Sequence, residues 1–196
     1  MFTGIIQHLG THRGFEAGAK ELRVECAALA GRAPLGGSVA VDGVCLSVVR
    51  VQGPLLVFNI SGETRDRTTL GALRPGAVIN LEAPLTLADP LGGHLVSGHV
   101  DFTTRLRRVQ TRPVGRRLSF ALPAAFRPYF IPQGSVAVNG VSLTVAALST
   151  AAFEVEIIPV TLEKSNLAGL RAGEAVNVEC DMIGKYIYNW MKKRHS

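Results

Sequence analysis

Hydroxyl and thiol side chains that recur at one spacing are the residues of this chain best suited to chemistry. Cys45 and Ser47 return 97 positions later as Ser142 and Thr144. Hydroxyl groups donate and accept hydrogen bonds, so they suit a pocket for a ligand with many polar groups. In isolation such residues are ordinary strand residues, and a buried thiol is more often a small apolar residue. Their recurrence in both places favours a functional role.

Histidine supplies the candidate for proton transfer. His99 has the side chain for it, because an imidazole accepts and returns a proton near neutral pH. Without further context, a histidine held by hydrogen bonds within a strand is the commoner case. His94 stands five positions earlier, and on a strand that spacing places the two side chains on opposite faces. We therefore predict no metal site.

The cysteines give no sign of cross-linking. Cys26, Cys45 and Cys180 are odd in number, widely spaced and outside any CxxC pair. This pattern argues against a disulfide framework or a zinc cluster. It predicts three reduced thiols.

These residues belong to a repeat that spans most of the chain. Residues 37–48 (GSVAVDGVCLSV) match residues 134–145 (GSVAVNGVSLTV) at nine of twelve positions, and residues 64–82 share a second set of identities with residues 161–179 at the same spacing. A single long duplication predicts two similar domains rather than a stack of short repeats. We expect one domain over residues 1–93, a second over residues 94–180 and a terminal segment over residues 181–196.

Within each copy the local patterns are those of strands. Leu22, Val24 and Cys26 alternate with charged residues, as in half-buried strands. Asp-Gly at 42–43 and Asn-Gly at 139–140 separate Val-rich runs, which predicts a type I′ hairpin in each copy. A short helix is expected after Thr64 and after Thr161. Many short strands favour closure, because a barrel has no exposed sheet edge.

The predicted fold class is therefore all-β: two homologous small Greek-key-like closed β-barrels in tandem, followed by a C-terminal α-helix. The helix is indicated by apolar residues at helical spacing, namely Met182, Ile183, Tyr186, Ile187, Trp190 and Met191. Such a stripe usually packs on its own chain. Two closed barrels already bury their own cores, so we favour a helix that joins subunits.

Composition and charge exclude several function classes. Hydrophobic residues make up 47% and charged residues 18%, which is typical of a globular protein. The chain has no apolar run of 18 residues and no apolar leader, so we expect a cytoplasmic protein without a membrane partner. The net charge is +6, and six arginines lie in residues 105–117. Since no aromatic residues alternate with them, we expect a solvated hairpin or loop and no nucleic acid partner.

Several longer motifs resemble the riboflavin synthase family. They are residues 1–6 (MFTGII), the paired GVCLSV and GVSLTV segments, residues 92–100 (GGHLVSGHV) and residues 158–167 (IPVTLEKSNL). The resemblance implies a dismutation without cofactor or metal. One 6,7-dimethyl-8-ribityllumazine gives a four-carbon unit to a second, forming riboflavin and 5-amino-6-ribitylaminouracil. Holding two like rings in register replaces a bimolecular encounter with an oriented one.

The resemblance also implies an assembly. Each active site would form between the N-terminal barrel of one subunit and the C-terminal barrel of its neighbour in a homotrimer, and an association with lumazine synthase is consistent with the family.

Matching the motifs residue by residue implies two substrate-binding sets. The first set consists of Gly4, Ile5, Ile6, Cys45, Leu46, Ser47, Asn59, Ile60, Ser61, Gly62, Glu63, Thr64, Gly98, His99 and Val100. The second consists of Gln133, Ser142, Leu143, Thr144, Ile158, Pro159, Val160, Thr161, Leu162 and Glu163. Gln133, Val160 and residues 61–66 depart from the residues common in the family, so the two pockets are expected to differ in affinity.

The resemblance implies catalytic roles for five residues. The acidic proton of the reaction lies on the C7 methyl group of the donor lumazine, so a base and hydrogen-bond donors are required. His99 is the implied base, and Thr144 would complete its relay. Ser142 is implied to act with Asp181, although a helix N-cap explains Asp181 equally simply. Cys45 stands opposite Ser142 in the repeat and would make the two pockets chemically unequal.

Two other functions remain open on the sequence. A non-catalytic lumazine or flavin antenna protein shares the duplicated barrel but tends to lose the second polar set, which this chain retains at Ser142, Thr144 and Thr161. A flavin-binding reductase would need a βαβ nucleotide-binding unit with a Gly-rich turn. No such unit is present in the sequence.

Overall fold

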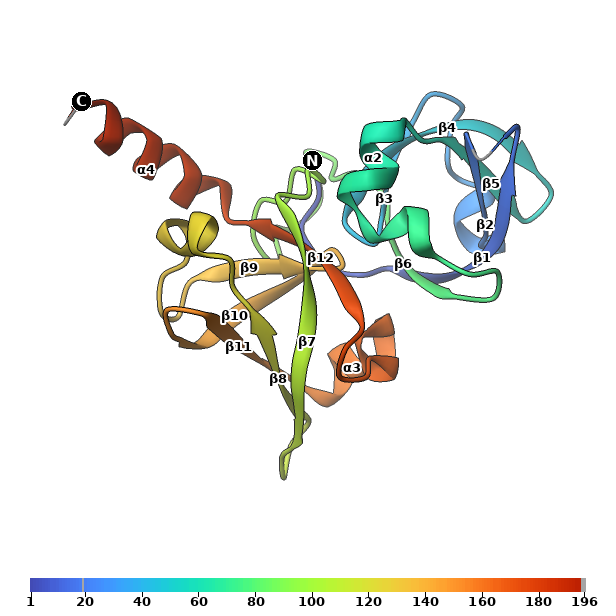
Figure 1. The fold of residues 1–196 in the computed structure, drawn as a ribbon. Coiled ribbons are helices and arrows are strands. Elements are labelled where there is room, and N and C mark those ends of the chain that lie inside the picture. The colour runs from blue at the N-terminus through green and yellow to red at the C-terminus, as the bar shows by residue number, and fades with distance from the viewer. Residues whose placement is uncertain (19, 195–196) are drawn as a thin grey trace.

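Two closed six-stranded barrels followed by a helix form the protein (Figure 1). The computed structural model describes residues 1–18 and 20–194. Residue 19, in the expected first domain, and residues 195–196, in the expected terminal segment, lie outside the described residues. The predicted all-β fold class with a terminal helix is confirmed.

The first barrel contains six antiparallel strands in the order β1-β2-β5-β4-β3-β6, and β6 pairs with β1 to close it. Its strands are β1 (His8–Glu16), β2 (Glu21–Glu25), β3 (Ser38–Val41), β4 (Val44–Gln52), β5 (Leu55–Asn59) and β6 (Val78–Glu82). Short helices connect them: α1 (Ala27–Ala30), α2 (Gly62–Arg67) and the 3₁₀ helix η1 (Thr69–Ala72).

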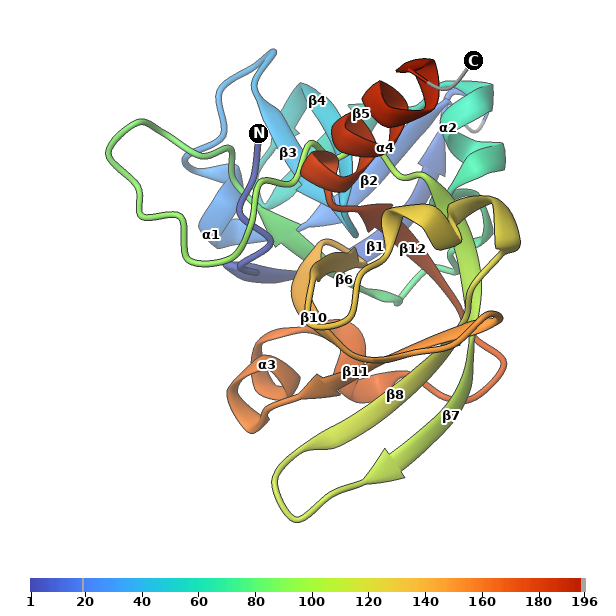
Figure 2. The same cartoon turned by 90° about the vertical axis from the view of Figure 1, so that its left-hand side faces the viewer.

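The second barrel repeats this order as β7-β8-β11-β10-β9-β12. Its strands are β7 (Phe102–Thr111), β8 (Arg116–Ala121), β9 (Ser135–Val138), β10 (Val141–Leu148), β11 (Ala152–Ile157) and β12 (Ala175–Cys180). Its helices are η2 (Ala124–Tyr129), α3 (Pro159–Lys164) and η3 (Asn166–Gly169), and α4 (Met182–Arg194) follows. Figure 2 shows the arginine-rich β7–β8 hairpin projecting from this barrel.

The predicted hairpins are present in both barrels. Asp42 and Gly43 have φ of 46° and 78°, and Asn139 and Gly140 have φ of 46° and 77°. Positive φ at both central residues is what a type I′ turn requires. The turns connect β3 to β4 and β9 to β10 in register. The short helices differ from expectation: α2 and α3 begin before Thr64 and Thr161 and so contain them, because Ser61 caps α2 and Pro159 begins α3.

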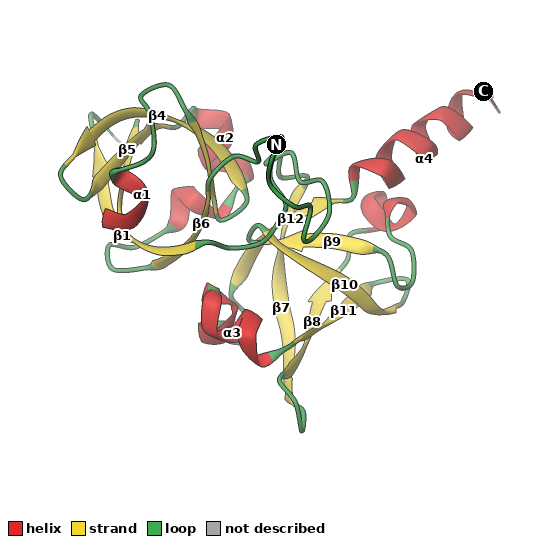
Figure 3. Ribbon diagram, turned by 180° about the vertical axis from the view of Figure 1, so that it is seen from behind, coloured by secondary structure: helices red, strands yellow, loops and turns green. Residues whose placement is uncertain are grey.

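Each barrel has its own hydrophobic core, and each core receives a residue from a segment outside that barrel's strands. Ile6, which precedes β1, lies in the core of the second barrel. Val100, which precedes β7, packs against the core of the first. The N-terminal segment therefore runs between the barrels (Figure 3). A small third cluster, centred on Phe2 and Val96, fills the space between them.

The terminal helix leaves the second barrel and extends away from both (Figures 1 and 3). None of its described residues is buried. Its base is held by an ion pair between Lys185 and Asp101, 3.0 Å apart, and by an edge-to-face contact of Tyr188 with Tyr129. No helix in residues 1–18 and 20–194 has the length and apolarity to cross a membrane.

Candidate functional site

A cavity of about 280 Å³ opens on the second barrel beside Ser142. It is mostly apolar, and a few polar groups converge on it, as is usual for a small-molecule pocket. The residues that line it are Gly4, Ile5, Ile6, Val141, Ser142, Ile158, Val160, Thr161, Lys164 and Ser165. Seven of them were predicted to bind substrate.

The backbone of the N-terminal segment lies directly against Ser142. The amide of Ser142 donates to the carbonyl of Gly4 at 2.8 Å. A Cβ atom on Gly4 would lie 2.6 Å from that of Ser142, and Gly4 has φ of 75°, so only glycine fits there. The expectation that Gly4, Ile5 and Ile6 share a pocket with Cys45 is wrong, because hydrogen bonding and core packing place them on the second barrel.

Ser142 has a histidine partner that the sequence reasoning did not assign. Nδ1 of His94 lies 2.7 Å from Oγ of Ser142. His94 is 8% exposed, and its Nε2 is buried without a hydrogen-bond partner among the described residues. Burial lowers the pKa of His94, and the charge of Asp181 raises it by a smaller amount. A neutral His94 therefore faces the hydroxyl group of Ser142.

The tautomer of His94 decides what the Ser142 hydroxyl can do. An unpaired buried N–H is rarer in proteins than an unpaired acceptor, which favours a proton on Nδ1 and a bare Nε2. Nδ1–H then donates to Oγ of Ser142, and the hydroxyl hydrogen is left to donate into the cavity. The pair can supply a hydrogen-bond donor for a substrate oxygen or nitrogen.

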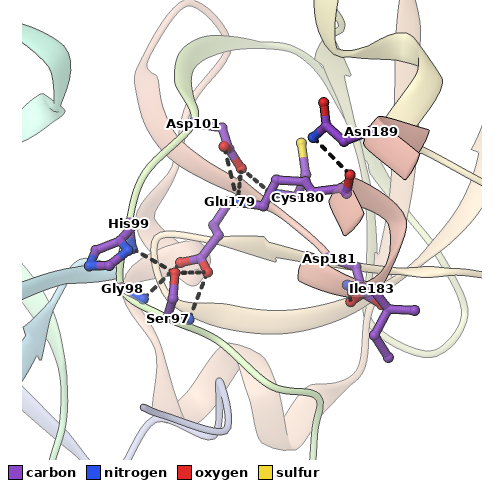
Figure 4. A network of polar contacts seen from close by, with 10 residues as sticks. Ser97, Gly98, His99, Asp101, Glu179, Cys180, Asp181, Ile183 and Asn189 are labelled. Carbon is purple, nitrogen blue, oxygen red and sulfur yellow. Dashed lines mark hydrogen bonds and ion pairs between the residues drawn. The ribbon is translucent and has the colours of Figure 1, made fainter. Parts of the chain in front are cut away.

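Asp181 makes the contact of a helix N-cap, and its action with Ser142 stays a prediction. Its Oδ1 accepts a hydrogen bond from the amide of Ile183 at 3.0 Å, which is the contact of a helix N-cap. Its charge also acts on His94, so it is linked to Ser142 through that histidine. Figure 4 shows Asp181 at the start of α4.

Strand alternation decides which predicted residues face outward. On β4, Cys45 and Ser47 are at least partly exposed, whereas Leu46 is 5% exposed and belongs to the core. On β10, Ser142 and Thr144 face outward and Leu143 is 8% exposed in the core. Because side chains alternate along a strand, the side chains of the two leucines pack into the cores, and only their backbone groups are left to meet a ligand.

The first barrel presents an equivalent arrangement around Cys45. The amide of Cys45 donates to the carbonyl of Gly98 at 2.8 Å. A Cβ atom on Gly98 would lie 2.5 Å from that of Cys45. His99 follows with an exposed side chain, and its amide donates to Oγ of Ser97 at 3.2 Å. The segment around Gly98 thus contacts the first barrel in the same way as the segment around Gly4 contacts the second.

The α2 residues predicted to bind substrate form a helix start. Oγ of Ser61 accepts from the amide of Thr64 at 3.0 Å, and Glu63 pairs with Arg67 at 2.8 Å. Asn59, Ser61, Gly62 and Glu63 are exposed, whereas Ile60 is buried in the first core. These contacts explain the local fold of residues 59–64 and leave their polar groups at the surface.

The α3 residues divide between two surfaces. Ile158, Val160 and Thr161 line the cavity beside Ser142. Leu162 and Glu163 instead line a larger cleft of about 660 Å³ between the barrels. Pro159 occupies the first turn of α3 and is exposed. Gln133 is exposed with φ of 63° and does not line the cavity.

The implied relay from His99 to Thr144 is not formed within one chain. Both side chains are exposed, and they belong to the sites on different barrels. No hydrogen bond joins them in the described part of the chain. Within residues 1–18 and 20–194, no group of three His, Cys, Asp or Glu side chains could hold a metal ion.

Four cavity or contact residues were missed by the sequence reasoning. Val141, Lys164 and Ser165 line the cavity, and His94 bonds Ser142. His94 was considered only as a metal ligand on a strand, whereas residues 92–101 contain no more than an isolated bridge. Val141 and Lys164 adjoin predicted residues and Ser165 lies two positions beyond one, so extending each motif by one or two positions would have found all three.

Comparisons with known proteins give a consistent result. A family model described as lumazine binding domain matches residues 3–84 and again residues 97–181. A protein of Mycobacterium tuberculosis named riboflavin synthase is 37% identical over 203 residues, with 98% of each chain covered. One of Bacillus subtilis with the same name is 34% identical over 195 residues, covering 98% of this chain and 91% of the relative.

Solved structures share the fold at lower identity. LumP complexed with riboflavin superposes with a TM-score of 0.83 at 22% identity, covering 92% of this chain and 99% of LumP. LumP complexed with 6,7-dimethyl-8-(1'-D-ribityl) lumazine gives 0.81 at 22% identity, covering 91% and 98%. These likenesses establish the tandem-barrel architecture.

Proposed function

The chain belongs to the riboflavin synthase family, whose lumazine binding domain it carries twice, and from that premise we propose that it converts two molecules of 6,7-dimethyl-8-ribityllumazine into riboflavin and 5-amino-6-ribitylaminouracil. Four carbons leave one lumazine and join the other. The atoms therefore balance between two substrates and two products, and no outside electrons are needed.

One observation carries this proposal: the chain builds the same kind of site twice. In each barrel, the second residue of the strand after the hairpin, Cys45 or Ser142, donates its amide hydrogen to the carbonyl of a glycine, Gly98 or Gly4, in the segment that precedes the other barrel. A reaction between two copies of one substrate suits two related pockets. Orienting both rings is worth several kcal/mol of the barrier, up to about 7 to 11 in well-aligned cases.

We assign the roles of the site residues as follows. His99 acts as base toward the C7 methyl group, with Thr144 of a neighbouring subunit completing the relay. Ser142 donates a hydrogen bond to the anion that forms, and His94 orients that hydroxyl. Asp181 acts on the pair through His94. Electrostatic stabilisation of this kind is often the largest single contribution to catalysis.

Cys45 and the other predicted binding residues complete the first pocket in this proposal. Ser47 and the polar groups of residues 59–64 lie at the surface of the first barrel, and in this proposal they hold the ribityl chain and the pyrimidinedione. The division into residues 1–93, 94–180 and 181–196 remains our proposal for the domains. Gly4 to Ile6 then belong to the first domain by sequence and to the second site by contact.

We further propose that the chain forms a homotrimer through α4. The helix exposes an apolar stripe with Ile183 and Trp190 each 58% exposed, Ile187 54% and Met191 50%. Large apolar side chains in such a stripe favour contact with another subunit. Assembly would also bring His99 of one chain to Thr144 of the next, which one chain does not do. Sedimentation equilibrium tests this, and a monomer would contradict it.

A cytoplasmic location and an association with lumazine synthase complete the proposal. The three cysteines are free thiols, which suits a reducing compartment. Co-sedimentation with lumazine synthase tests the association, and independent sedimentation of the two proteins would exclude it.

The decisive experiment is incubation of the purified protein with the lumazine alone. We expect riboflavin fluorescence to grow with time, and half as many moles of riboflavin to form as lumazine is consumed. An antenna protein would bind the lumazine with a stable spectrum and form no riboflavin. Retention of Ser142 and its buried partner His94 favours the enzyme over that alternative.

A further inference from the structure

Two buried glutamates hold the segments that precede the two barrels. Glu82, at the end of β6, is 2% exposed. Its Oε1 accepts from the amide and hydroxyl of Thr3 at 2.7 and 2.8 Å, and its Oε2 accepts from the amide of Gly4 at 3.0 Å. Three donors thus converge on one carboxylate.

The second barrel repeats this arrangement with Glu179 at the corresponding place on β12. Glu179 is 3% exposed. Its Oε1 accepts from the amide and hydroxyl of Ser97 at 2.7 and 2.6 Å, and its Oε2 accepts from the amide of Gly98 at 2.9 Å. Figure 4 shows the carboxylate of Glu179 facing Ser97 and Gly98, with His99 next along the chain.

Each held segment contributes to the pocket of the opposite barrel. Glu82 belongs to the first barrel, but the Gly4 that it holds accepts from Ser142 of the second. Glu179 belongs to the second barrel, but the Gly98 that it holds accepts from Cys45 of the first. The contacts therefore cross between the barrels in both directions.

The two segments also bind each other where they cross. The amide of Phe2 donates to the carbonyl of Val96 at 2.8 Å, and the amide of Val96 returns a bond to Phe2 at 3.0 Å. The amide of His94 donates to the carbonyl of Thr3 at 3.1 Å. His94 lies in one segment and bonds the other. Movement of either segment would therefore displace the histidine that bonds Ser142.

A carboxylate is suited to this task because it is a pure acceptor with two oxygens. A buried charge is costly unless it is hydrogen-bonded, and here three donors compensate each one. Burial raises the pKa of Glu82, and the donors from Thr3 and Gly4 lower it. An amide in its place would direct an N–H group at one of the donors, so the segment would lose its fixed position.

We propose that Glu82 and Glu179 are crossed positioning residues: Glu82 of the first barrel sets the geometry of the Ser142 pocket, and Glu179 of the second sets the geometry of the Cys45 pocket and His99. This inference deepens the proposed function and rests on it for the catalytic consequence. The structural consequence stands independently, because it predicts which pocket each glutamate controls.

The test uses Glu82→Gln and Glu179→Gln in the full chain. The matched controls are Glu25→Gln, at a partly exposed glutamate of the first barrel, and Glu156→Gln, at an exposed glutamate of the second. Urea unfolding of each variant shows that it is folded under the assay conditions. Two local probes then report on the pockets. The alkylation rate of Cys45 by iodoacetamide, read by peptide mass spectrometry, reports on the first, and the backbone amide ¹H–¹⁵N resonance of Ser142, which bonds Gly4, reports on the second.

We expect a crossed pattern. Glu179→Gln raises the alkylation rate of Cys45 about fivefold through local opening and leaves the Ser142 amide resonance near its wild-type position. Glu82→Gln shifts the Ser142 amide resonance, because the Gly4 carbonyl that accepts from it moves, and leaves Cys45 alkylation near the wild-type rate. Each variant slows riboflavin formation about tenfold or more, as mispositioning of catalytic groups does, and neither control changes any of these readouts.

Two results would overturn the proposal. In one, each variant disturbs only the pocket of its own barrel; in the other, both variants disturb both probes alike, as a general loss of stability would. The outcome is separable from that of the proposed function. A crossed pattern in a protein that makes no riboflavin would leave the positioning role intact, whereas an active wild type with unaffected variants would reject it alone.

Discussion

The two barrels have one strand order but differ at the polar positions around their hairpins. The second barrel places Ser142 against the buried His94, whereas Cys45 of the first has no histidine hydrogen-bonded to it in the described part of the chain. At the turn itself, Asp42 stands opposite Asn139, and both are buried, at 2% and 4% exposure. The duplicated scaffold is therefore symmetric, and its chemistry is not.

A shared polar network shows how much symmetry the scaffold keeps. Side-chain amides cross between the barrels: Asn80 donates to the carbonyl of Asn139 and Asn177 to that of Asp42, each at 2.9 Å. A Cβ atom on Gly43 would lie 2.6 Å from the amide nitrogen of Gly140. The two hairpins thus meet closely. The effect of a substitution in one hairpin can therefore be compared with the effect of the same substitution in the other.

The largest effect that separates the barrels is expected at Ser142. Ser142→Ala should slow riboflavin formation by about two to three orders of magnitude, because it removes a hydrogen-bond donor aimed at developing charge. Steady-state kinetics with the lumazine measure this, and Ser149→Ala on the same barrel is the control. His99→Ala should slow turnover to a similar degree. Near-normal rates with a normal unfolding curve would remove both residues from the mechanism.

The next effect concerns stability and follows from Asp42. Burial raises the pKa of this carboxyl from 3.8 to about 7, although the amide of Asn80 and the side chain of Asn166 donate to it. Between these two values the folded protein keeps a proton that the unfolded chain releases. Stability therefore falls as the pH rises from about 4 to 7 and is flat above that.

Asp42→Asn should remove this loss of stability with rising pH, because the amide is neutral at every pH. It also matches the residue at position 139. Above pH 7 the variant should be more stable by on the order of 4 kcal/mol, because the pKa of Asp42 rises from 3.8 to about 7 and one pKa unit corresponds to about 1.4 kcal/mol. Urea unfolding at pH 5 and pH 8 measures the difference. Asn139→Asp provides the reciprocal variant and should steepen the pH dependence. Parallel curves for wild type and Asp42→Asn would refute the assignment.

A smaller effect is expected inside the first barrel, at His12. The side chain is fully buried, and neither ring nitrogen has a hydrogen-bond partner in the described residues. Its ring makes an edge-to-face contact with that of Phe15. The pairing of β1 with β6 and of β7 with β12 aligns His12 with Leu106, which is 1% exposed. The second barrel thus has an apolar residue where the first has an unsatisfied polar one.

His12→Leu should stabilise the protein by about 1 to 3 kcal/mol, because it removes a buried polar group that lacks its hydrogen bonds. The shift of the urea midpoint measures this, and riboflavin formation should not change. The reverse exchange, Leu106→His, should destabilise the second barrel. If His12→Leu were less stable than the wild type, the imidazole would have to make a stabilising interaction in the first barrel.

The sequence predicted the barrels but not how they exchange segments. Two signals were sufficient to predict the fold: the repeat at a spacing of 97 residues and the paired Asp-Gly and Asn-Gly turns. The turns are local in sequence, and the repeat is found by comparing the chain with itself. The preceding segments follow a different spacing: Gly4 corresponds to Gly98, 94 positions later. A loop three residues longer hides that match from a gapless comparison. Which barrel a segment contacts is a tertiary property, so Gly4 was grouped with the wrong pocket.

The smallest expected effect is the one that tests whether the difference between the pockets is chemical. Cys45→Ser gives the first barrel the residue of the second. The backbone bond from residue 45 to Gly98 is kept, and among the described residues no histidine hydrogen-bonds residue 45 as His94 bonds Ser142. Turnover should therefore change by no more than about threefold. The reciprocal Ser142→Cys should cost much more, because a thiol is a weak acceptor for Nδ1 of His94. Equal losses in the two variants would mean that the pockets are interchangeable and that the His94 contact does not distinguish them.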